Sequence, residues 1–190
     1  MLESLCVYCG AKSGSNPVYA TVAAELGRAL AQQGTRLVYG GGNVGLMGVI
    51  ADAVLEQGGQ VTGVIPEALV SRELAHVRVL DMRIVRSMHA RKSLMAELSQ
   101  GFVALPGGLG TYEELFEMLT WGQLGFHEKP VALLNVNRFY DPLLMMLDRA
   151  VEDGFLSAAN RRRLFMATAV SELMDHFGRH AEHSSSGSLS

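Results

Sequence analysis

Glu114 follows a glycine-rich loop at a spacing that could place a carboxylate beside a bound phosphate. The loop spans residues 106–110, Pro-Gly-Gly-Leu-Gly, and follows an apolar strand at 102–105. Glycines lack the Cβ atoms that block close approach, so their backbone N–H groups can converge on an anion. With Thr111 as the N-cap of the next helix, the positive helix end would point at the same place. The stretch is a candidate phosphate site with a catalytic carboxylate one turn away.

The same spacing has a purely structural interpretation. Thr111-x-x-Glu114 matches a capping box, in which the glutamate side chain returns to the N–H of the cap residue. The spacing alone favours neither interpretation of Glu114.

A second group of chemically active side chains lies on a helix expected over residues 88–98, with Ser87 as its cap. Met88, Arg91 and Met95 share one face of this helix. A cation beside soft apolar groups suits a ligand with an anionic part and a flat aromatic part. The alternative is an ordinary amphipathic helix with a solvated Arg91-Lys92 pair.

Two further loops of small residues follow expected strands, at 10–14 and 40–45. The second matches G-x-G-x-x-G over Gly40, Gly42 and Gly45, and Glu67 lies where a dinucleotide fold would place a ribose-binding acid. The match indicates a phosphate or nucleotide role. It also leaves a nicotinamide-dependent oxidoreductase as an alternative, although the other two loops would then have no task.

Strand and helix patterns alternate along the chain. Strands are expected at 4–8, 36–39, 60–65, 78–85, 102–105 and 131–134, with a short one near 167–170. Helices are expected at 17–33 after an Asn16 cap, up to about 56, at 88–98, 111–125 and 141–152, and from 171 onward. This order predicts an α/β fold with a doubly wound, mainly parallel, Rossmann-like sheet and helices on both faces. Residues 1–180 would form one domain and residues 181–190 a flexible tail, and the three loops would line one crevice.

Composition narrows the class of protein. The 190 residues are 48% hydrophobic and 18% charged with a formal net charge of -3, which indicates neither disorder nor nucleic-acid binding. No apolar run reaches the ~20 residues of a membrane span, and the N-terminus lacks the pattern of a signal peptide. We therefore expect a cytoplasmic protein that binds neither membranes nor nucleic acid.

The cysteine and histidine patterns do not indicate a metal or redox site. Cys6 and Cys9 form a C-x-x-C, but residues three apart on a strand point to opposite faces, so we expect buried structural thiols. His176, His180 and His183 recur at helical spacing, and a frayed, solvated terminus is the favoured interpretation.

Two motifs in the right order carry a resemblance that covers nearly the whole chain. With Met-His-Ala-Arg-Lys at 88–92 and Pro-Gly-Gly-Leu-Gly-Thr-Tyr-Glu-Glu at 106–114, the chain resembles the LOG family, cytokinin riboside 5′-monophosphate phosphoribohydrolases formerly labelled lysine decarboxylase-like. The resemblance implies a homodimer and hydrolysis of a nucleoside 5′-monophosphate to free base and ribose 5-phosphate. It implies Arg91 and Glu114 as catalytic residues, with no metal or cofactor. The loop at 10–14 departs from the Gly-Ser-Ser pattern of many relatives.

The motifs together predict a set of substrate-binding residues: Ser13, Gly41, Gly42, Gly45, Met88, Lys92, Gly107, Gly108, Gly110 and Thr111. The sequence leaves open whether the base is adenine or N6-prenylated adenine. A module that binds AMP-like nucleotides without cleaving them is the main alternative. A true lysine decarboxylase would need a Schiff-base lysine, for which Lys92 beside Arg91 is a poor candidate.

Overall fold

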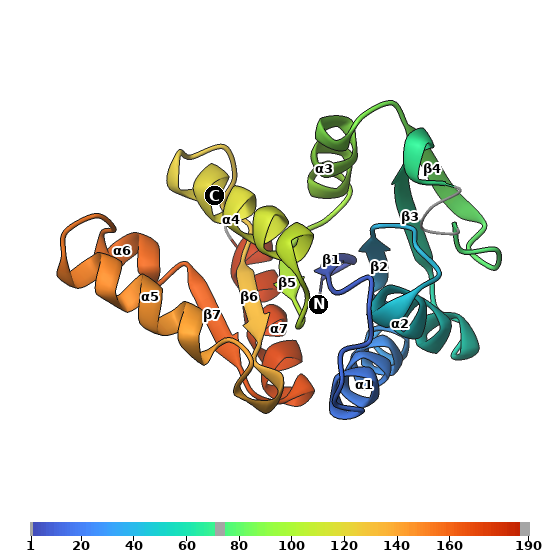
Figure 1. The fold of residues 1–190 in the computed structure, drawn as a ribbon, viewed down its shortest axis with the longest axis horizontal. Coiled ribbons are helices and arrows are strands. Elements are labelled where there is room, and N and C mark those ends of the chain that lie inside the picture. The colour runs from blue at the N-terminus through green and yellow to red at the C-terminus, as the bar shows by residue number, and fades with distance from the viewer. Residues whose placement is uncertain (1, 71–74, 187–190) are drawn as a thin grey trace.

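The computed structural model describes residues 2–70 and 75–186 of the chain. Within these residues, seven strands form one sheet (Figure 1). The strands are β1 (Ser4–Tyr8), β2 (Arg36–Tyr39), β3 (Val61–Pro66), β4 (Asp81–Val85), β5 (Phe102–Ala104), β6 (Val131–Leu134) and β7 (Leu164–Ala167). The α-helices are α1 (Val18–Gln32), α2 (Gly45–Glu56), α3 (Met88–Glu97), α4 (Leu109–Gln123), α5 (Asp141–Glu152), α6 (Ala158–Arg161) and α7 (Val170–Ser186); the 3-10 turns are η1 (Glu67–Leu69) and η2 (Val136–Arg138).

The strands lie in the order β4-β3-β2-β1-β5-β6-β7, and each neighbouring pair is parallel. β1 is central, because Val7 pairs with Tyr39 of β2 on one side and with Val103 of β5 on the other. The chain builds outward from β1 to β4 and then builds the other half from β5 to β7. This confirms the predicted doubly wound parallel fold. The strand order reverses between β1 and β5, where such sheets bind ligands beyond the carboxyl ends of their strands.

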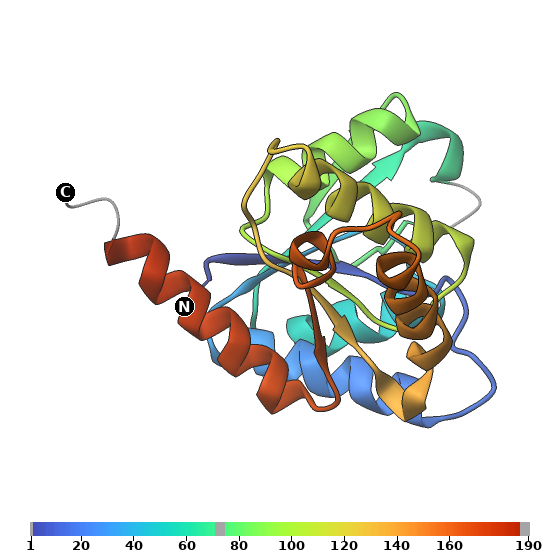
Figure 2. The same ribbon diagram turned by 90° about the vertical axis from the view of Figure 1, so that its left-hand side faces the viewer.

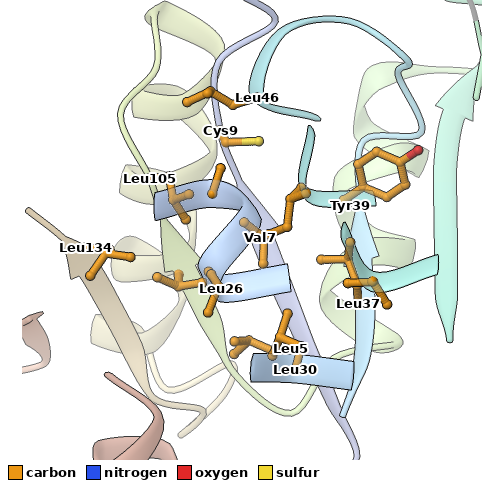
Figure 3. Close-up of a cluster of buried hydrophobic side chains, with 14 of the residues drawn as sticks. Leu5, Val7, Cys9, Leu26, Leu30, Leu37, Tyr39, Leu46, Leu105 and Leu134 are labelled. Atoms are coloured by element: carbon orange, nitrogen blue, oxygen red, sulfur yellow. The ribbon is translucent and has the colours of Figure 1, made fainter. Parts of the chain in front are cut away.

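Helices cover both faces of the sheet, as Figure 2 shows with α1 (blue) and α7 (red) below it and α3 (green) above it. Every residue of β1 is buried, which explains why its sequence is a continuous apolar run. Leu5 and Val7 pack in one core cluster with Leu26 and Leu30 of α1 (Figure 3). The opposite cluster lies under α3, α4 and α5.

The two cysteines are free thiols, both buried, and they lie in opposite core clusters. Cys6 packs beneath α3 and α4, whereas Cys9 packs beneath α1 and α2. The prediction of buried structural cysteines on opposite faces is confirmed. Burial raises the pKa of both thiols well above the ordinary range.

Several element boundaries differ from the sequence prediction. Helix α1 has Pro17 as its N-cap residue, one position after the predicted cap, although Asn16 Oδ1 still accepts a hydrogen bond from the Val18 N–H at 3.0 Å. Helix α6 is a single turn capped by Ser157 and is too short for hydrophobic periodicity to reveal. Strand β7 ends at Ala167, where the predicted strand begins.

The C-terminal helix α7 runs to Ser186, so the predicted boundary between domain and tail at residue 180 falls inside it. Residues 187–190 of the predicted tail lie outside the described residues. The ring of His176 stacks on Phe165 with centroids 3.7 Å apart, so this histidine does not belong to a frayed terminus. The side chain of His183 also lies outside the described part.

Candidate active site

A cavity of about 610 Å³ opens at the carboxyl ends of β1 and β5, which is the point where the strand order reverses. This volume is in the range of small-molecule sites. The loops that follow the two strands, residues 10–14 and 106–111, both line it. They are tied together by a 3.1 Å hydrogen bond from the Gly10 N–H to the Pro106 carbonyl. Helices α3 and α4 supply further walls.

The loop after β5 delivers the first turn of α4 to this cavity. Gly108 is the N-cap residue, and the first intrahelical hydrogen bond runs from the Tyr112 N–H to the Gly108 carbonyl at 3.1 Å. The first N–H groups of a helix have no intrahelical partner, and here the residues that carry them line the cavity. The positive end of the α4 dipole therefore faces the space where an anion would bind.

The prediction that Thr111 is the N-cap is wrong, because Gly108 is the N-cap residue of α4. The helix begins at Leu109, because Gly108 is extended and caps the helix three residues earlier than expected. Thr111 is a buried residue of the first turn, and a Cβ at Gly107 would overlap its Oγ1. With the cap at Gly108, Glu114 is not at the capping-box position, and its half-buried side chain lines the cavity.

Arg91 approaches the same cavity from α3, which begins after the predicted Ser87 cap; Ser87 Oγ accepts the Ala90 N–H at 3.1 Å. Arg91 is only 5% exposed, and two backbone carbonyls hold its guanidinium. Nη2 donates to the Gly40 carbonyl at 2.8 Å, and Nε donates to the Val64 carbonyl at 3.1 Å. Gly40 directly follows β2 and Val64 lies within β3, so the sheet holds the arginine in place.

The soft face predicted on α3 also meets the cavity. Met88 and Met95 both line it, and Met88 Sδ lies 3.9 Å from Arg91 Nη1. Aromatic residues from distant segments add to these apolar contacts: Tyr19 of α1 and Phe139 beside η2 line the cavity with ring centroids 6.0 Å apart. Two apolar walls thus flank the charged groups.

The remaining predicted binding residues divide into two groups. Ser13, Gly107, Gly108 and Gly110 line the cavity, as does Thr111. Gly41, Gly42, Gly45 and Lys92 are not among the residues that line it. Their contact with substrate stays a prediction.

The glycines of the second loop have packing tasks that the structure makes visible. A Cβ at Gly45 would overlap the peptide between Ala11 and Lys12, so this glycine lets the first loop cross over α2. Gly41 has a positive φ of 78°. Glu67, the candidate ribose-binding acid, is exposed on η1 and is not among the cavity residues.

Sequence reasoning missed Lys12, Glu113, Tyr19 and Phe139, which line the cavity as well. Lys12 had a signal, since it lies within the first small-residue loop. Tyr19 and Phe139 had none, because only the fold brings these two positions together. Among the described residues, Lys12 and Arg91 are the cations that line the cavity.

Buried ionisable groups beneath the cavity report the charges around them. Burial is the main cause that raises the pKa of Cys6; the charge of Glu114 raises it further and that of Arg91 lowers it. Burial and the Cys6 thiol likewise raise the pKa of Tyr8, so the phenol stays neutral. The floor of the cavity is therefore uncharged, and its charges lie on the walls.

Neither a metal cluster nor a membrane span is found in the described part of the chain. No group of three or more His, Cys, Asp or Glu side chains there is arranged to hold a metal ion. None of the described helices combines the length and apolar character needed to traverse a bilayer.

Fold and site together define a Rossmann-type α/β protein with a ligand cavity at the switch point of its sheet. Residues 47–177 match the family model described as "Possible lysine decarboxylase". The chain belongs to this family, whose curated members include the LOG proteins.

Similar proteins carry one activity in their names. The chain is 49% identical over 170 residues to the cytokinin riboside 5′-monophosphate phosphoribohydrolase LOG of Oryza sativa subsp. japonica, covering 90% of this chain and 70% of that protein. It is 49% identical over 169 residues to the cytokinin riboside 5′-monophosphate phosphoribohydrolase of Rhodococcoides fascians, covering 88% of this chain and 85% of that protein.

Solved structures agree with the fold. The molybdenum cofactor binding protein from Rippkaea orientalis superposes with a TM-score of 0.71 at 22% identity, covering 95% of this chain and 98% of that one. The Moco carrier protein from Chlamydomonas reinhardtii gives 0.70 at 22% identity, covering 94% and 97%. At this identity the likeness concerns the fold alone.

Proposed function

We propose that this protein hydrolyses the N-glycosidic bond of a nucleoside 5′-monophosphate to give a free base and ribose 5-phosphate. The observation that carries the proposal is the meeting of three features at one cavity: the N-terminus of α4, the Arg91 guanidinium and the Glu114 carboxylate. The relatives at 49% identity are named for this reaction.

The 5′-phosphate would bind at the first turn of α4. The N–H groups there and the positive helix end favour an anion. Lys12 and Ser13 line the same cavity from the loop after β1. The phosphate takes no part in bond cleavage. Binding of the phosphate fixes the ribose C1′ relative to the catalytic groups. The binding energy of a group that does not react is thus used to orient the one that does.

Glu114 and Arg91 would act on the two ends of the scissile bond. When the bond between C1′ and the base nitrogen breaks, its electron pair goes to the base and positive charge develops at C1′. Glu114 would stabilise that charge and orient the attacking water, whose oxygen bonds to C1′. One proton of this water would pass through the carboxylate to the departing base, and the other would stay on the new hydroxyl group at C1′. Arg91 would stabilise the negative charge on the base, since a guanidinium with a pKa above about 12 is a poor proton donor.

The base would lie against the apolar walls. Met88 and Met95 offer adaptable thioether surfaces, and the cavity of about 610 Å³ exceeds the needs of a phosphate and a ribose alone. AMP and N6-prenylated adenine nucleotides are both proposed as substrates. Trp121 packs against the core cluster under α4 and is not among the residues that line the cavity.

The residues do not fit the decarboxylase chemistry that the family description suggests. Such chemistry uses pyridoxal phosphate bound as a Schiff base to a nucleophilic lysine. The Lys92 ammonium is buried, forms ion pairs with Glu113 and Glu117, and does not line the cavity. Lys92 is therefore a poor nucleophile for a Schiff base.

We also propose a homodimer in the cytoplasm. Exposed apolar side chains support a partner surface: Leu109, which lines the cavity, is 86% exposed, and Phe126, beyond the C-terminal end of α4, is 72% exposed. Two free, buried thiols are compatible with a reducing compartment. Sedimentation equilibrium and cell fractionation test the two statements separately.

The reaction is tested by chromatography with AMP and isopentenyladenosine 5′-monophosphate beside the two nucleosides that lack the phosphate. We expect free base and ribose 5-phosphate from the monophosphates and no cleavage of the nucleosides. Binding of AMP without release of base from any substrate would refute hydrolysis and support a nucleotide-binding module.

A further inference from the structure

Lys92 is a buried cation that faces away from the cavity, between α3 and α4. Its side chain is 6% exposed, and its Nζ contacts Glu113 Oε1 and lies 3.1 Å from Glu117. Burial alone would lower the pKa of Lys92, but the hydrogen bonds and charges of the two glutamates outweigh it and raise that pKa. The ammonium therefore stays charged and ties α3 to α4.

The two carboxylates that Lys92 holds differ in their surroundings. Glu113 is 53% exposed at its side chain and lines the cavity, whereas Glu117 is 21% exposed and does not. Glu113 and Glu117 are four residues apart, so the two negative charges lie on the same face of α4. One lysine thus compensates one carboxylate on the cavity wall and one behind it.

The positions next to this ion pair carry the proposed reaction. Arg91 precedes Lys92 on α3, and Glu114 follows Glu113 on α4; both line the cavity. An anionic nucleotide must enter beside Glu113, and an uncompensated carboxylate at that place would repel its phosphate in a partly dehydrated site.

We propose that Lys92 is a positioning residue for the reaction: it neutralises Glu113 and holds that carboxylate against α3, so that the nucleotide phosphate can occupy the cavity. The inference rests on the proposed function and assigns Lys92 a task different from direct contact with substrate. The two carboxylates then have different roles. Glu113 affects substrate binding because it lines the cavity, whereas Glu117 serves the packing of α4 on α3.

The test is a charge-rescue series on the full-length protein. Lys92→Met is expected to raise the KM for AMP, and its dissociation constant measured by calorimetry, by roughly tenfold or more, with a smaller change in kcat. Adding Glu113→Gln to Lys92→Met should restore most of the affinity. Adding Glu117→Gln, the matched control, should raise the melting temperature of Lys92→Met without restoring affinity for AMP.

A merely structural ion pair would behave differently. Equal recovery of affinity from the two Gln substitutions, or unchanged AMP affinity in a folded Lys92→Met protein, would overturn the proposal. If Lys92→Met alone does not fold, the two double variants are compared directly, and equal affinities for AMP overturn it. Because AMP binding is measured apart from turnover, a wild-type protein that binds AMP without cleaving it refutes the hydrolase while leaving this series informative.

Discussion

Gly40 and Arg91 are fitted to each other. The Gly40 carbonyl accepts a 2.8 Å hydrogen bond from Arg91 Nη2, and a Cβ on residue 40 would overlap the same nitrogen. The guanidinium thus passes directly over the end of β2, where any side chain would displace it. The second glycine-rich loop positions a cation as well as closing a tight turn.

This relationship predicts that Gly40→Ala lowers activity without unfolding the protein. The added methyl would push Arg91 away from the Gly40 carbonyl, and a shift of about 1 Å in a catalytic group can lower turnover by about a hundredfold. Steady-state kinetics and circular dichroism measure the two effects. Gly178→Ala is the matched control, because a Cβ there meets no atom within 4 Å and the residue lies in α7. Normal kcat in Gly40→Ala would show that the position of Arg91 does not limit the reaction.

Replacement of Glu114 by glutamine should separate binding from chemistry. The amide keeps the size of the side chain but cannot stabilise positive charge at C1′, so we expect kcat to fall by roughly a thousandfold or more. The dissociation constant of AMP, measured by calorimetry, should change little. Near-normal turnover in this variant would show that Glu114 has a structural role and no catalytic one.

The doubly wound parallel sheet and the loops after its strands could be predicted because they depend on local signals. β1, β2 and β5 are short apolar runs that end in glycine-rich loops, and parallel pairing brings those ends to one edge. The motifs around Arg91 and Glu114 belong to these local signals, and both residues line the cavity.

What could not be predicted depends on three-dimensional neighbours. The position of Lys92 against Glu113 and Glu117 requires the packing of α3 beside α4, which no local pattern specifies. The sequence predicts the wrong cap for α4, because Thr111 is a better cap by residue type than Gly108. Only the fold shows that a Cβ at Gly107 would overlap the Thr111 side chain.

Stability should fall as the pH rises above about 8.5, the ordinary pKa of a thiol. Burial raises the pKa of Cys6 and of Cys9, so the folded state keeps two protons that the unfolded chain loses, and fewer protons bound in the unfolded state mean lower stability at higher pH. Each thiol contributes a slope of up to about 1.4 kcal/mol per pH unit. Guanidinium unfolding between pH 7.5 and 10 measures the slope.

The paired variant Cys6→Ala with Cys9→Ala is the control for this slope. It should be less stable at pH 7.5 but lose less of its remaining free energy of unfolding between pH 8.5 and 9.5. An unchanged slope in that variant would assign the effect to groups other than the two thiols.

Lys12 should determine how strongly substrate binding depends on salt. It lines the cavity from the loop after β1, it is exposed, and among the described residues it forms no ion pair. Lys12→Met is expected to raise the KM for AMP about threefold to tenfold with little change in kcat, since a cation near the phosphate binds ground state and transition state alike. The KM of the variant should also change less than that of the wild type between 50 and 300 mM NaCl. Over this range the Debye length falls by roughly half. Inhibition by adenosine, which carries no phosphate, is the control and should be equal in the two proteins. Equal KM values for AMP at every salt concentration would place the phosphate away from Lys12, against the first turn of α4 alone.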